Sequence, residues 1–197
     1  MQPPQDSSDS VRSRDGALFL RPFEESDITE RYLSWFRDDI ATRYLEARNI
    51  SAEDALGYLR SGKLERSRFT YAICAGDTGL HIGNVKIGDI DWKSSLSDLV
   101  TVIGDRDYWG KGIATSAIRT AIDIGFERHE LRKFSAWIYS KNIGSLKAYT
   151  RAGFVVEAVL HGQRLGPDGV NDLIAVSCFN PKYFPTLPAF PLPLPGE

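Results

Sequence analysis

One segment past the middle of the chain constrains the fold more than any other part of the sequence. The short β-branched run Leu99–Ile103 predicts a strand, which ends at Gly104. From Gly112 to Glu127, apolar residues recur at helical spacing on one face, which predicts an amphipathic helix. A strand, a tight loop and a long helix in this order indicate a domain in which helices pack on a sheet.

The loop between this strand and helix contains two glycines, Gly110 and Gly112. They let the backbone bend and its amides approach a ligand closely, and the helix N-terminus adds unpaired N–H groups and the positive end of a dipole. With the charges of Arg106 and Lys111, the segment suits a phosphate or pyrophosphate group. A glycine-rich turn that only joins strand to helix is the alternative. The spacing fits neither a P-loop nor a dinucleotide-binding GxGxxG motif.

The rest of the pattern alternates between strands and helices in the order βααβββαβαββ, which predicts an α+β domain with a mixed sheet. Ser26-Asp27 is the expected N-cap of the first helix, and Ser51 to Asp54 has the capping-box pattern that starts the second. The expected strands are residues 17–21, 69–75, 81–90, 99–103, 134–139, 154–160 and 173–179, and the last two helices are residues 112–127 and 143–151.

Composition places the chain in the ordinary globular class. Its 197 residues carry a net charge of −2 and are 42% hydrophobic, which predicts one domain around one core. The net charge argues against nucleic-acid binding by bulk positive charge. The sequence contains no run of about 18 apolar residues, so no membrane-spanning helix is expected. We therefore expect a soluble, cytoplasmic monomer or homodimer with neither a nucleic-acid nor a membrane partner.

The two ends of the sequence differ from its middle. Residues 1–16 are polar and predict a disordered leader, residues 17–183 form the expected domain, and residues 184–197 predict an extended proline-rich tail. Cys74 and Cys178 are interpreted as buried free thiols. The three histidines are scattered without metal-ligand spacing, so no metal site is expected.

Three polar residues after the predicted loop share one helix. Asn142 lies at or near the N-cap, and Ser145 and Tyr149 are four residues apart on one face. A buried tyrosine hydroxyl beside a bound cofactor can donate a proton, because its free pKa is about 10. An ordinary cap and an ordinary half-buried aromatic residue are the alternatives.

Together these features resemble a known family. Tyr-Trp-Gly-Lys-Gly-Ile-Ala-Thr at 108–115, then Asn142-x-x-Ser145-x-x-x-Tyr149 and Ala-Gly-Phe at 152–154, are similar to the GNAT acetyl-CoA-dependent N-acetyltransferases. The opening LxLRPF at 18–23 and the strand with Asp172 point to the branch that contains ribosomal-protein alanine, spermidine and nucleotide-aminosugar acetyltransferases. The resemblance covers residues 17–180. It implies the fold of that family, a mixed, mostly antiparallel central sheet flanked by helices.

The resemblance also implies roles for individual residues, with acetyl-CoA as co-substrate and no metal. The strand Leu99–Ile103 would part from its neighbour and hold the pantetheine arm on its exposed edge, and Tyr149 would protonate the leaving thiolate. The residues expected to contact the co-substrate are Val100, Val102, Tyr108, Trp109, Gly110, Lys111, Gly112, Ile113, Ala114, Thr115, Asn142 and Ser145.

The acceptor amine must attack in its neutral form, so a general base or a water chain is expected. Asp98, one residue before the co-substrate strand, is the first candidate, because the family often places an acid there. Asp89 and Asp91 come second and His81 third. A solvated turn carboxylate is the alternative for each acid. Asp172 is interpreted as structural, paired with an arginine.

One position departs from the family pattern. The family usually has Gln or Arg three residues before the first loop glycine, whereas this chain has Asp107. An acid near a pyrophosphate is unfavourable unless it points away. Arg106, directly before it, is the residue that would compensate.

The acceptor is expected to be a primary amine of a small molecule, such as an aminosugar or a polyamine. A protein N-terminus, as in the ribosomal-protein branch, is the alternative acceptor, and a non-catalytic acyl-CoA-binding protein on the same fold is the alternative of another class. Several aromatic residues are candidates to stack on an acceptor, although packing in the core explains them as well. They are Trp35, Phe36, Tyr44, Trp92 and Tyr139.

Overall fold

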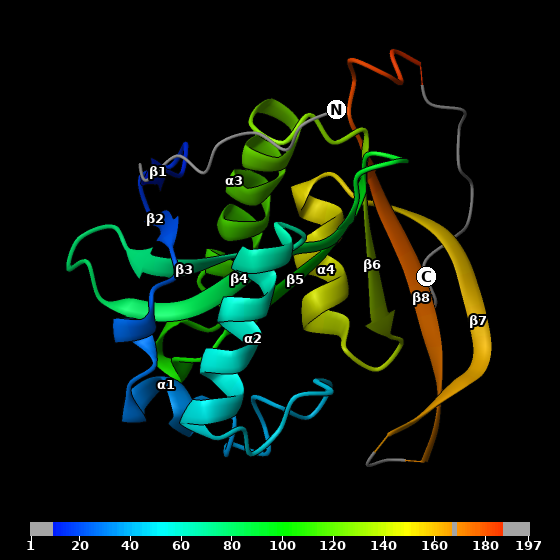
Figure 1. Ribbon diagram of the computed structural model, residues 1–197. Coiled ribbons are helices and arrows are strands. Elements are labelled where there is room, and N and C mark those ends of the chain that lie inside the picture. The colour runs from blue at the N-terminus through cyan, green and yellow to red at the C-terminus, as the bar shows by residue number, and fades with distance from the viewer. Residues whose placement is uncertain (1–9, 167–168, 187–197) are drawn as a thin grey trace.

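The computed structural model describes residues 10–166 and 169–186. Within them, one mixed sheet of eight strands has the order β1-β2-β3-β4-β5-β6-β8-β7 and is flanked by four α-helices (Figure 1). All neighbouring strands pair antiparallel except β5 and β6. The strands are β1 Val11–Arg12, β2 Leu18–Pro22, β3 Phe69–Ala75, β4 His81–Asp91, β5 Leu96–Ile103, β6 Lys133–Tyr139, β7 Val155–Gly166 and β8 Gly169–Phe179. The helices are α1 Glu30–Trp35, α2 Ala52–Glu65, α3 Ile113–Glu127 and α4 Ile143–Ala152, with 3₁₀ turns η1 Glu25–Asp27 and η2 Arg106–Tyr108.

The α+β class, the mixed sheet and the order of the expected elements are confirmed. Two local predictions are wrong. Helix α1 begins after Thr29, whose side chain accepts a hydrogen bond from the Tyr32 N–H, and the segment with Ser26 and Asp27 forms the separate turn η1 instead. The first strand, expected at residues 17–21, instead ends one residue later, at Pro22.

The predicted disordered leader is also wrong for the part that the structure describes. Val11–Arg12 pairs with β2, and Ser13 is buried. Arg14 forms an ion pair with Asp123, and Asp15 accepts a hydrogen bond from Ser116, so this segment is tied to α3. These partners lie far along the chain, which is why local composition did not reveal them. Residues 1–9 and 187–197, which hold most of the predicted leader and tail, lie outside the described residues.

The sheet buries apolar side chains on both faces. Alternate residues of β3 point to opposite sides, Tyr71 and Ile73 to one cluster and Ala72 and Cys74 to the other. The larger cluster is covered by α3 and α4, and the smaller one by α2 and the region of α1 (Figure 1). Cys74 and Cys178 are buried and free, as predicted.

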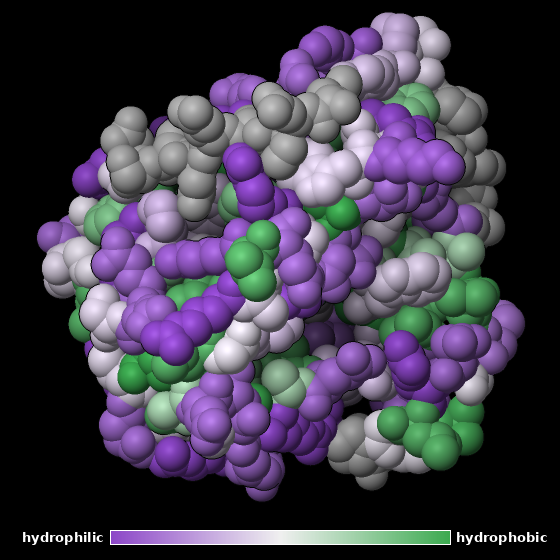
Figure 2. All heavy atoms as spheres, in the orientation of Figure 1, coloured by the Kyte–Doolittle hydropathy of each residue, from purple (hydrophilic) through white to green (hydrophobic). Residues whose placement is uncertain are grey.

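The exterior is mainly hydrophilic in the view of Figure 2. Apolar side chains gather at the end of the β7–β8 hairpin, where Leu165 and Val170 are exposed. No helix of the described residues is long and apolar enough to cross a membrane.

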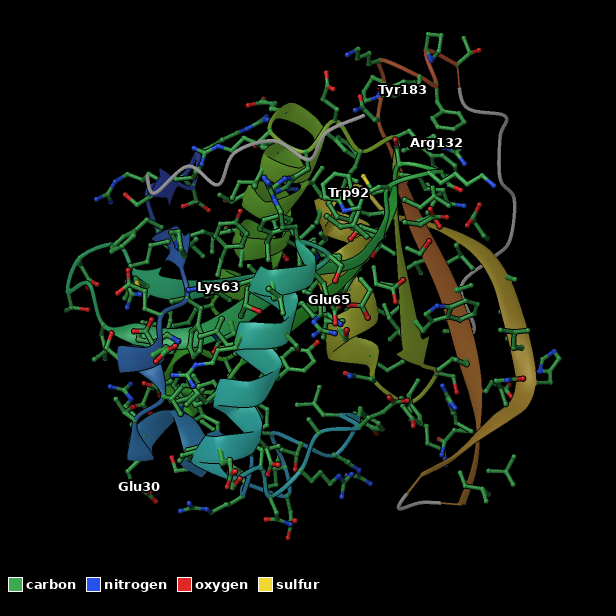
Figure 3. All side chains as sticks on the ribbon, viewed as in Figure 1. Glu30, Lys63, Glu65, Trp92, Arg132 and Tyr183 are labelled. Atoms are coloured by element: carbon green, nitrogen blue, oxygen red, sulfur yellow. The ribbon has the colours of Figure 1, made fainter. Side chains whose placement is uncertain are left out.

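A buried histidine lies where α3, β3 and the β4–β5 turn meet. The ring of His129 stacks on Phe69 with centroids 4.3 Å apart, and Trp92 meets it edge-on at 6.4 Å. Arg132 donates from Nε to the Ser94 carbonyl and so fixes the turn beside Trp92 (Figure 3). Both ring nitrogens of His129 are buried without a hydrogen-bond partner among the described residues. Burial lowers the pKa of His129 to about 4.

This histidine predicts acid-sensitive stability. The unfolded chain takes up a proton on His129 near pH 6.5, while the folded chain resists protonation down to about pH 4. Stability is therefore lost as the pH falls through this window, by up to about 3 kcal/mol. We expect His129→Phe to flatten the dependence of unfolding free energy on pH between 7 and 4, measured by urea titration.

The matched control is His161→Gln, because His161 is exposed on β7. If the wild-type and His129→Phe proteins lose the same stability across the window, His129 is not the group that titrates.

Candidate active site

The site is organised by a fork in the sheet. The parallel strands β5 and β6 pair only at three positions, of which Asp98 with Ser135 is the last. Beyond it, β5 continues to pair with β4 as far as Ile103, and β6 continues to pair with β8 as far as Tyr139. Each strand follows its other neighbour, so a gap opens between them. The edge of β5 beyond Asp98 faces this gap without a strand partner.

Tyr149 lies beneath the fork on α4. Asn142 caps the start of this helix by accepting from the Ser145 N–H, and Gly153 ends it in the left-handed region. The Tyr149 hydroxyl donates a 2.8 Å hydrogen bond to the carbonyl of Leu99, the first residue past the fork. Burial raises the pKa of Tyr149 above its usual range, so the hydroxyl stays protonated at neutral pH.

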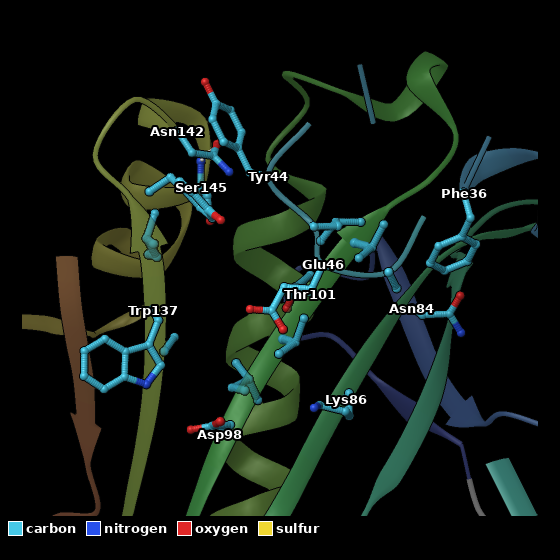
Figure 4. Close-up of a pocket in the computed structure, with 18 of the residues that line it drawn as sticks. Phe36, Tyr44, Glu46, Asn84, Lys86, Asp98, Thr101, Trp137, Asn142 and Ser145 are labelled. Carbon is cyan, nitrogen blue, oxygen red and sulfur yellow. Dashed lines mark hydrogen bonds between the residues drawn. The ribbon is translucent and has the colours of Figure 1, made fainter. Parts of the chain in front are cut away.

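Asn142 and Ser145 line the gap on the side of α4 (Figure 4). The amide oxygen of Asn142 caps the helix, which explains why an asparagine directly precedes α4. The amide nitrogen of Asn142 and the hydroxyl of Ser145 have no hydrogen-bond partner among the described residues. Both remain in position to contact a ligand in the gap.

Asp98 is half-buried at the point where the strands part, and it lines the same gap (Figure 4). Opposite it, β4 has an irregularity in register between Ile87 and Ile90. Burial raises the pKa of Asp98, while the charge of Lys86 opposes the shift. Among the described residues, no side chain donates a hydrogen bond to its carboxylate. Such a carboxylate can accept a proton from a group that enters the gap.

The other acids and the histidine considered from sequence lie outside the gap. Asp89 is exposed and pairs with Arg68 at 3.1 Å, and Asp91 caps the β4–β5 turn by accepting from the Ser94 N–H. His81 packs among aromatic rings, its Nε2 3.3 Å from the Asn84 side chain. Asp172 is bound by the His161 ring and the Gly162 N–H, so the expected arginine partner is wrong.

The glycine loop forms the start of α3. Gly110 and Gly112 have φ values of 72° and 80°, which favour glycine, and a side chain at either would meet open space. The Asp105 carboxylate accepts from the Asp107 N–H and so shapes η2. The first amides of α3 lack intrahelical partners by the geometry of any helix start. Residues 108–115 thus expose backbone amides at a helix start, the kind of geometry that can bind an anion, and they do not line the gap itself.

The charges beside this loop are arranged differently from the expectation. Arg106 is bound to Asp38 of the segment after α1, and its guanidinium lies 5.8 Å from the Trp109 ring. It is not aimed at the helix start as a free cation. Asp107 is exposed on η2. Lys111 is exposed and lies over the Tyr108 ring at 5.6 Å.

A cavity of about 1040 Å³ joins the gap to a cleft between α2 and the sheet. Tyr149, Asp98, Val100, Val102, Asn142 and Ser145 all line it, as do Phe36, Tyr44 and Tyr139. Trp35 and Trp92 do not: Trp35 packs on Gly104, and Trp92 donates to the Arg66 carbonyl.

Sequence reasoning missed several lining residues, Lys86, Asn84, Thr101 and Trp137. The Thr101 hydroxyl is buried without a partner among the described residues. Trp137 on β6 also lines the cavity, and its side chain is exposed. Because side chains alternate between the two faces of a strand, the sequence could have placed Thr101 on the same face as Leu99. No local pattern indicates that Lys86 or Trp137 faces a cavity. Within the described residues, no cluster of His, Cys, Asp or Glu could hold a metal ion.

The chain is similar in sequence to known N-acetyltransferases. The chain is 24% identical over 164 residues to the uncharacterized N-acetyltransferase p20 of Bacillus licheniformis, covering 81% of this chain and 90% of the relative. It is 25% identical over 147 residues to the uncharacterized N-acetyltransferase YoaA of Bacillus subtilis, covering 73% and 82%.

Solved structures share the fold. The spermidine N-acetyltransferase from Vibrio cholerae, in complex with CoA and spermine, superposes with a TM-score of 0.76 at 19% identity, covering 85% of this chain and 98% of that one. A GNAT-family acetyltransferase from Bacillus anthracis gives 0.72 at 15% identity, covering 87% and 98%. Residues 17–155 match the acetyltransferase (GNAT) domain family. The chain therefore belongs to the GNAT acetyltransferases.

Proposed function

We propose that this enzyme transfers an acetyl group from acetyl-CoA to a primary amine of a small molecule, by direct attack of the amine. The observation that carries the proposal is the fork between β5 and β6. It brings a protonated hydroxyl, Tyr149, and an unpaired carboxylate, Asp98, to one cavity. Acetyl transfer from a thioester to an amine needs one group that accepts the proton of the amine and another that protonates the departing sulfur.

The residues around the gap fit the co-substrate. The unpaired edge of β5 beyond Asp98 offers backbone hydrogen bonds to the amide-bearing pantetheine arm. The exposed side chains of Val100 and Trp137 provide apolar walls. The amides of residues 108–115 would hold the pyrophosphate at the start of α3. Acetyl-CoA supplies a thioester, whose C–S bond breaks as the C–N bond of the product forms.

The side chains at the fork divide the proton transfers between them. Asp98 would take the proton that the attacking amine must lose. Tyr149 would give its proton to the departing sulfur, and its high pKa keeps that proton available at neutral pH. Its hydrogen bond to Leu99 holds the hydroxyl at the gap until then.

The mouth of the cavity supports a small acceptor. The segment between α1 and α2 crosses the opening and reaches the far side of the fork. Tyr44 lies 5.5 Å from the ring of Tyr139, and Glu46 lies 3.4 Å from Arg164 on β7. These contacts narrow the approach for a protein N-terminus. The Vibrio cholerae neighbour, whose structure contains spermine, has the same fold.

An acceptor survey tests the proposal. Acetyl-CoA binding is measured by calorimetry, and thiol release is followed with aminosugars, polyamines, amino acids and peptides that begin with Ala or Ser. We expect binding of acetyl-CoA and turnover with at least one small amine. Binding without turnover on any amine would favour an acyl-CoA-binding protein, and turnover on peptides alone would favour protein N-terminal acetylation.

Removing the Tyr149 hydroxyl tests the proton donor. We expect Tyr149→Phe to lower kcat by roughly 10- to 100-fold or more, reaching the lower end of the usual range for lost acid catalysis, with the Kd for acetyl-CoA nearly unchanged. Stability is expected to fall by about 1 kcal/mol, because the Leu99 carbonyl loses its partner. Assays well below the Tm separate the two effects. A kcat equal to that of the wild type would leave Tyr149 a purely structural role.

Removing the charge of Asp98 tests the proton acceptor. A base acts when deprotonated, so its activity is lost as the pH falls through its pKa, which burial raises. We expect kcat/KM, expressed per neutral amine, to show this acid limb in the wild type. In Asp98→Asn the limb should be absent and kcat lower by roughly 10²- to 10⁴-fold. Asp91→Asn, at the exposed β4–β5 turn, is the control.

The same variant should be more stable at neutral pH. Because the folded state raises the pKa of Asp98, the charged form weakens folding at pH 7 and this cost disappears at pH values where the carboxyl is protonated in both states. Asp98→Asn is therefore expected to raise the Tm at pH 7 and to leave it unchanged near pH 3. A lower Tm at pH 7 would mean that the carboxylate is stabilised in the fold.

A further inference from the structure

Of the five ionic side chains of the described residues that line the cavity, three are engaged with other protein groups. Glu46 is paired with Arg164 at 3.4 Å. The Asp54 carboxylate accepts from the N–H and hydroxyl of Ser51 at 2.9 and 2.6 Å, in the capping box of α2. The remaining charges of the lining are Asp98 and Lys86. Among the described residues, Lys86 has no carboxylate within ion-pair distance.

Lys86 lies on the acceptor side of the fork, next to Asp98. It is half-buried on β4, in register with Val100 of β5, and Asp98 is two residues away from Val100 on the same face. Diagonal neighbours on adjacent strands are roughly 7–8 Å apart at Cα, within reach of a long side chain. Both side chains enter the same region of the cavity (Figure 4). The lysine charge already acts on the carboxylate, since it opposes the burial that raises the pKa of Asp98.

We infer that the acceptor is an amine that also carries an anionic group, a carboxylate or a phosphate, and that Lys86 binds this group while the amine lies at Asp98. The inference rests on the proposed acetyl transfer and names the substrate class of that same cavity. An ammonium with three donors binds such an oxyanion through charge-assisted hydrogen bonds. Because Lys86 and Asp98 are on adjacent strands, the anionic group lies only a few bonds from the reacting nitrogen.

The same arrangement disfavours a polyamine. A polyamine brings additional positive charges into a half-buried cleft that already holds a lysine, and like charges repel more strongly there than in water. Of the other carboxylates in the lining, Glu46 is offset by Arg164, and Asp54 keeps its charge but is exposed to solvent at the start of α2. The remaining wall of the cleft is aromatic, formed by Tyr32, Phe36 and Tyr58, and would contact the uncharged body of the acceptor.

Matched pairs of acceptors test the inference. Each pair differs in one anionic group: glucosamine 6-phosphate with glucosamine, and phenylalanine with phenylalaninamide, with spermidine as the polycation. Thiol release is measured at saturating acetyl-CoA, and kcat/KM is expressed per neutral amine, because the members of a pair differ in amine pKa. We expect the anionic member of at least one pair to be favoured tenfold or more over its neutral partner and over spermidine. The phosphate and carboxylate pairs show which anion is used.

Variants at position 86 show whether the lysine is responsible. Lys86→Met should abolish the preference by raising KM for the anionic member only, and Lys86→Arg should retain it. Lys93→Met, at the exposed β4–β5 turn, should change neither member. Tm measurements confirm that each variant is folded.

Three results would overturn the inference. One is a preference for spermidine or for the neutral members, and another is an equal loss of kcat for both members in Lys86→Met, which would mean that Lys86 only adjusts Asp98. In both cases acetyl transfer itself would still stand. The third is acetyl-CoA binding with no amine acetylated, which would refute the proposed function and this inference with it.

Discussion

The hydrogen bond from the Tyr149 hydroxyl to the Leu99 carbonyl is the interaction on which the site depends. When β6 leaves β5 after Asp98, the next carbonyl of β5 loses its strand partner. A buried carbonyl without a partner costs about 1–3 kcal/mol, which would favour closing the fork. Tyr149 supplies the missing donor from α4, so the gap persists without that cost. The atoms that keep the fork open therefore also place a hydroxyl proton at the gap, which joins the stability of the site to its proposed chemistry.

The charged side chains at the fork differ from this hydrogen bond, because they lower the stability of the fold. Asp98 occupies the last paired position of β5, where burial disfavours its charge, and no side chain among the described residues donates a hydrogen bond to it. Lys86 moderates this cost without forming an ion pair, since its charge lowers the pKa of Asp98 from beyond 4 Å. A direct pair would have stabilised both groups and removed them from the cavity. Because the two charges are separated, Asp98 remains able to accept a proton and Lys86 to bind an anion. The protein is less stable as a result.

The sequence predicts the elements well and the contacts between distant segments poorly. Apolar periodicity and the caps at Ser51 and Asn142 determine the helices from local residues, and these predictions agree with the structure. Ser145 and Tyr149, which the sequence places on one face of a helix, line the same cavity, whereas the glycine loop does not line it. Lys86 was missed because its importance depends on the register of β4 with β5. The partner of Arg106 was missed because Asp38 is 68 residues away, and the ordered segment at Arg14 because Asp123 is 109 residues away.

The two halves of the cavity are not independent, because one segment contacts both. On one side, Arg31 pairs with Asp105 and Asp38 pairs with Arg106, which ties the region of α1 to the loop before α3. On the other side, Tyr44 and Glu46 of the same segment reach β6 and β7 across the fork. Ion pairs that are partly exposed contribute only about 0–1 kcal/mol each, so the sum of these contacts holds the segment, with no single one dominating. A phosphate at the start of α3 would compete with Asp38 for Arg106. If the co-substrate binds as proposed, we expect its phosphate groups to influence the acceptor side of the cavity through this segment.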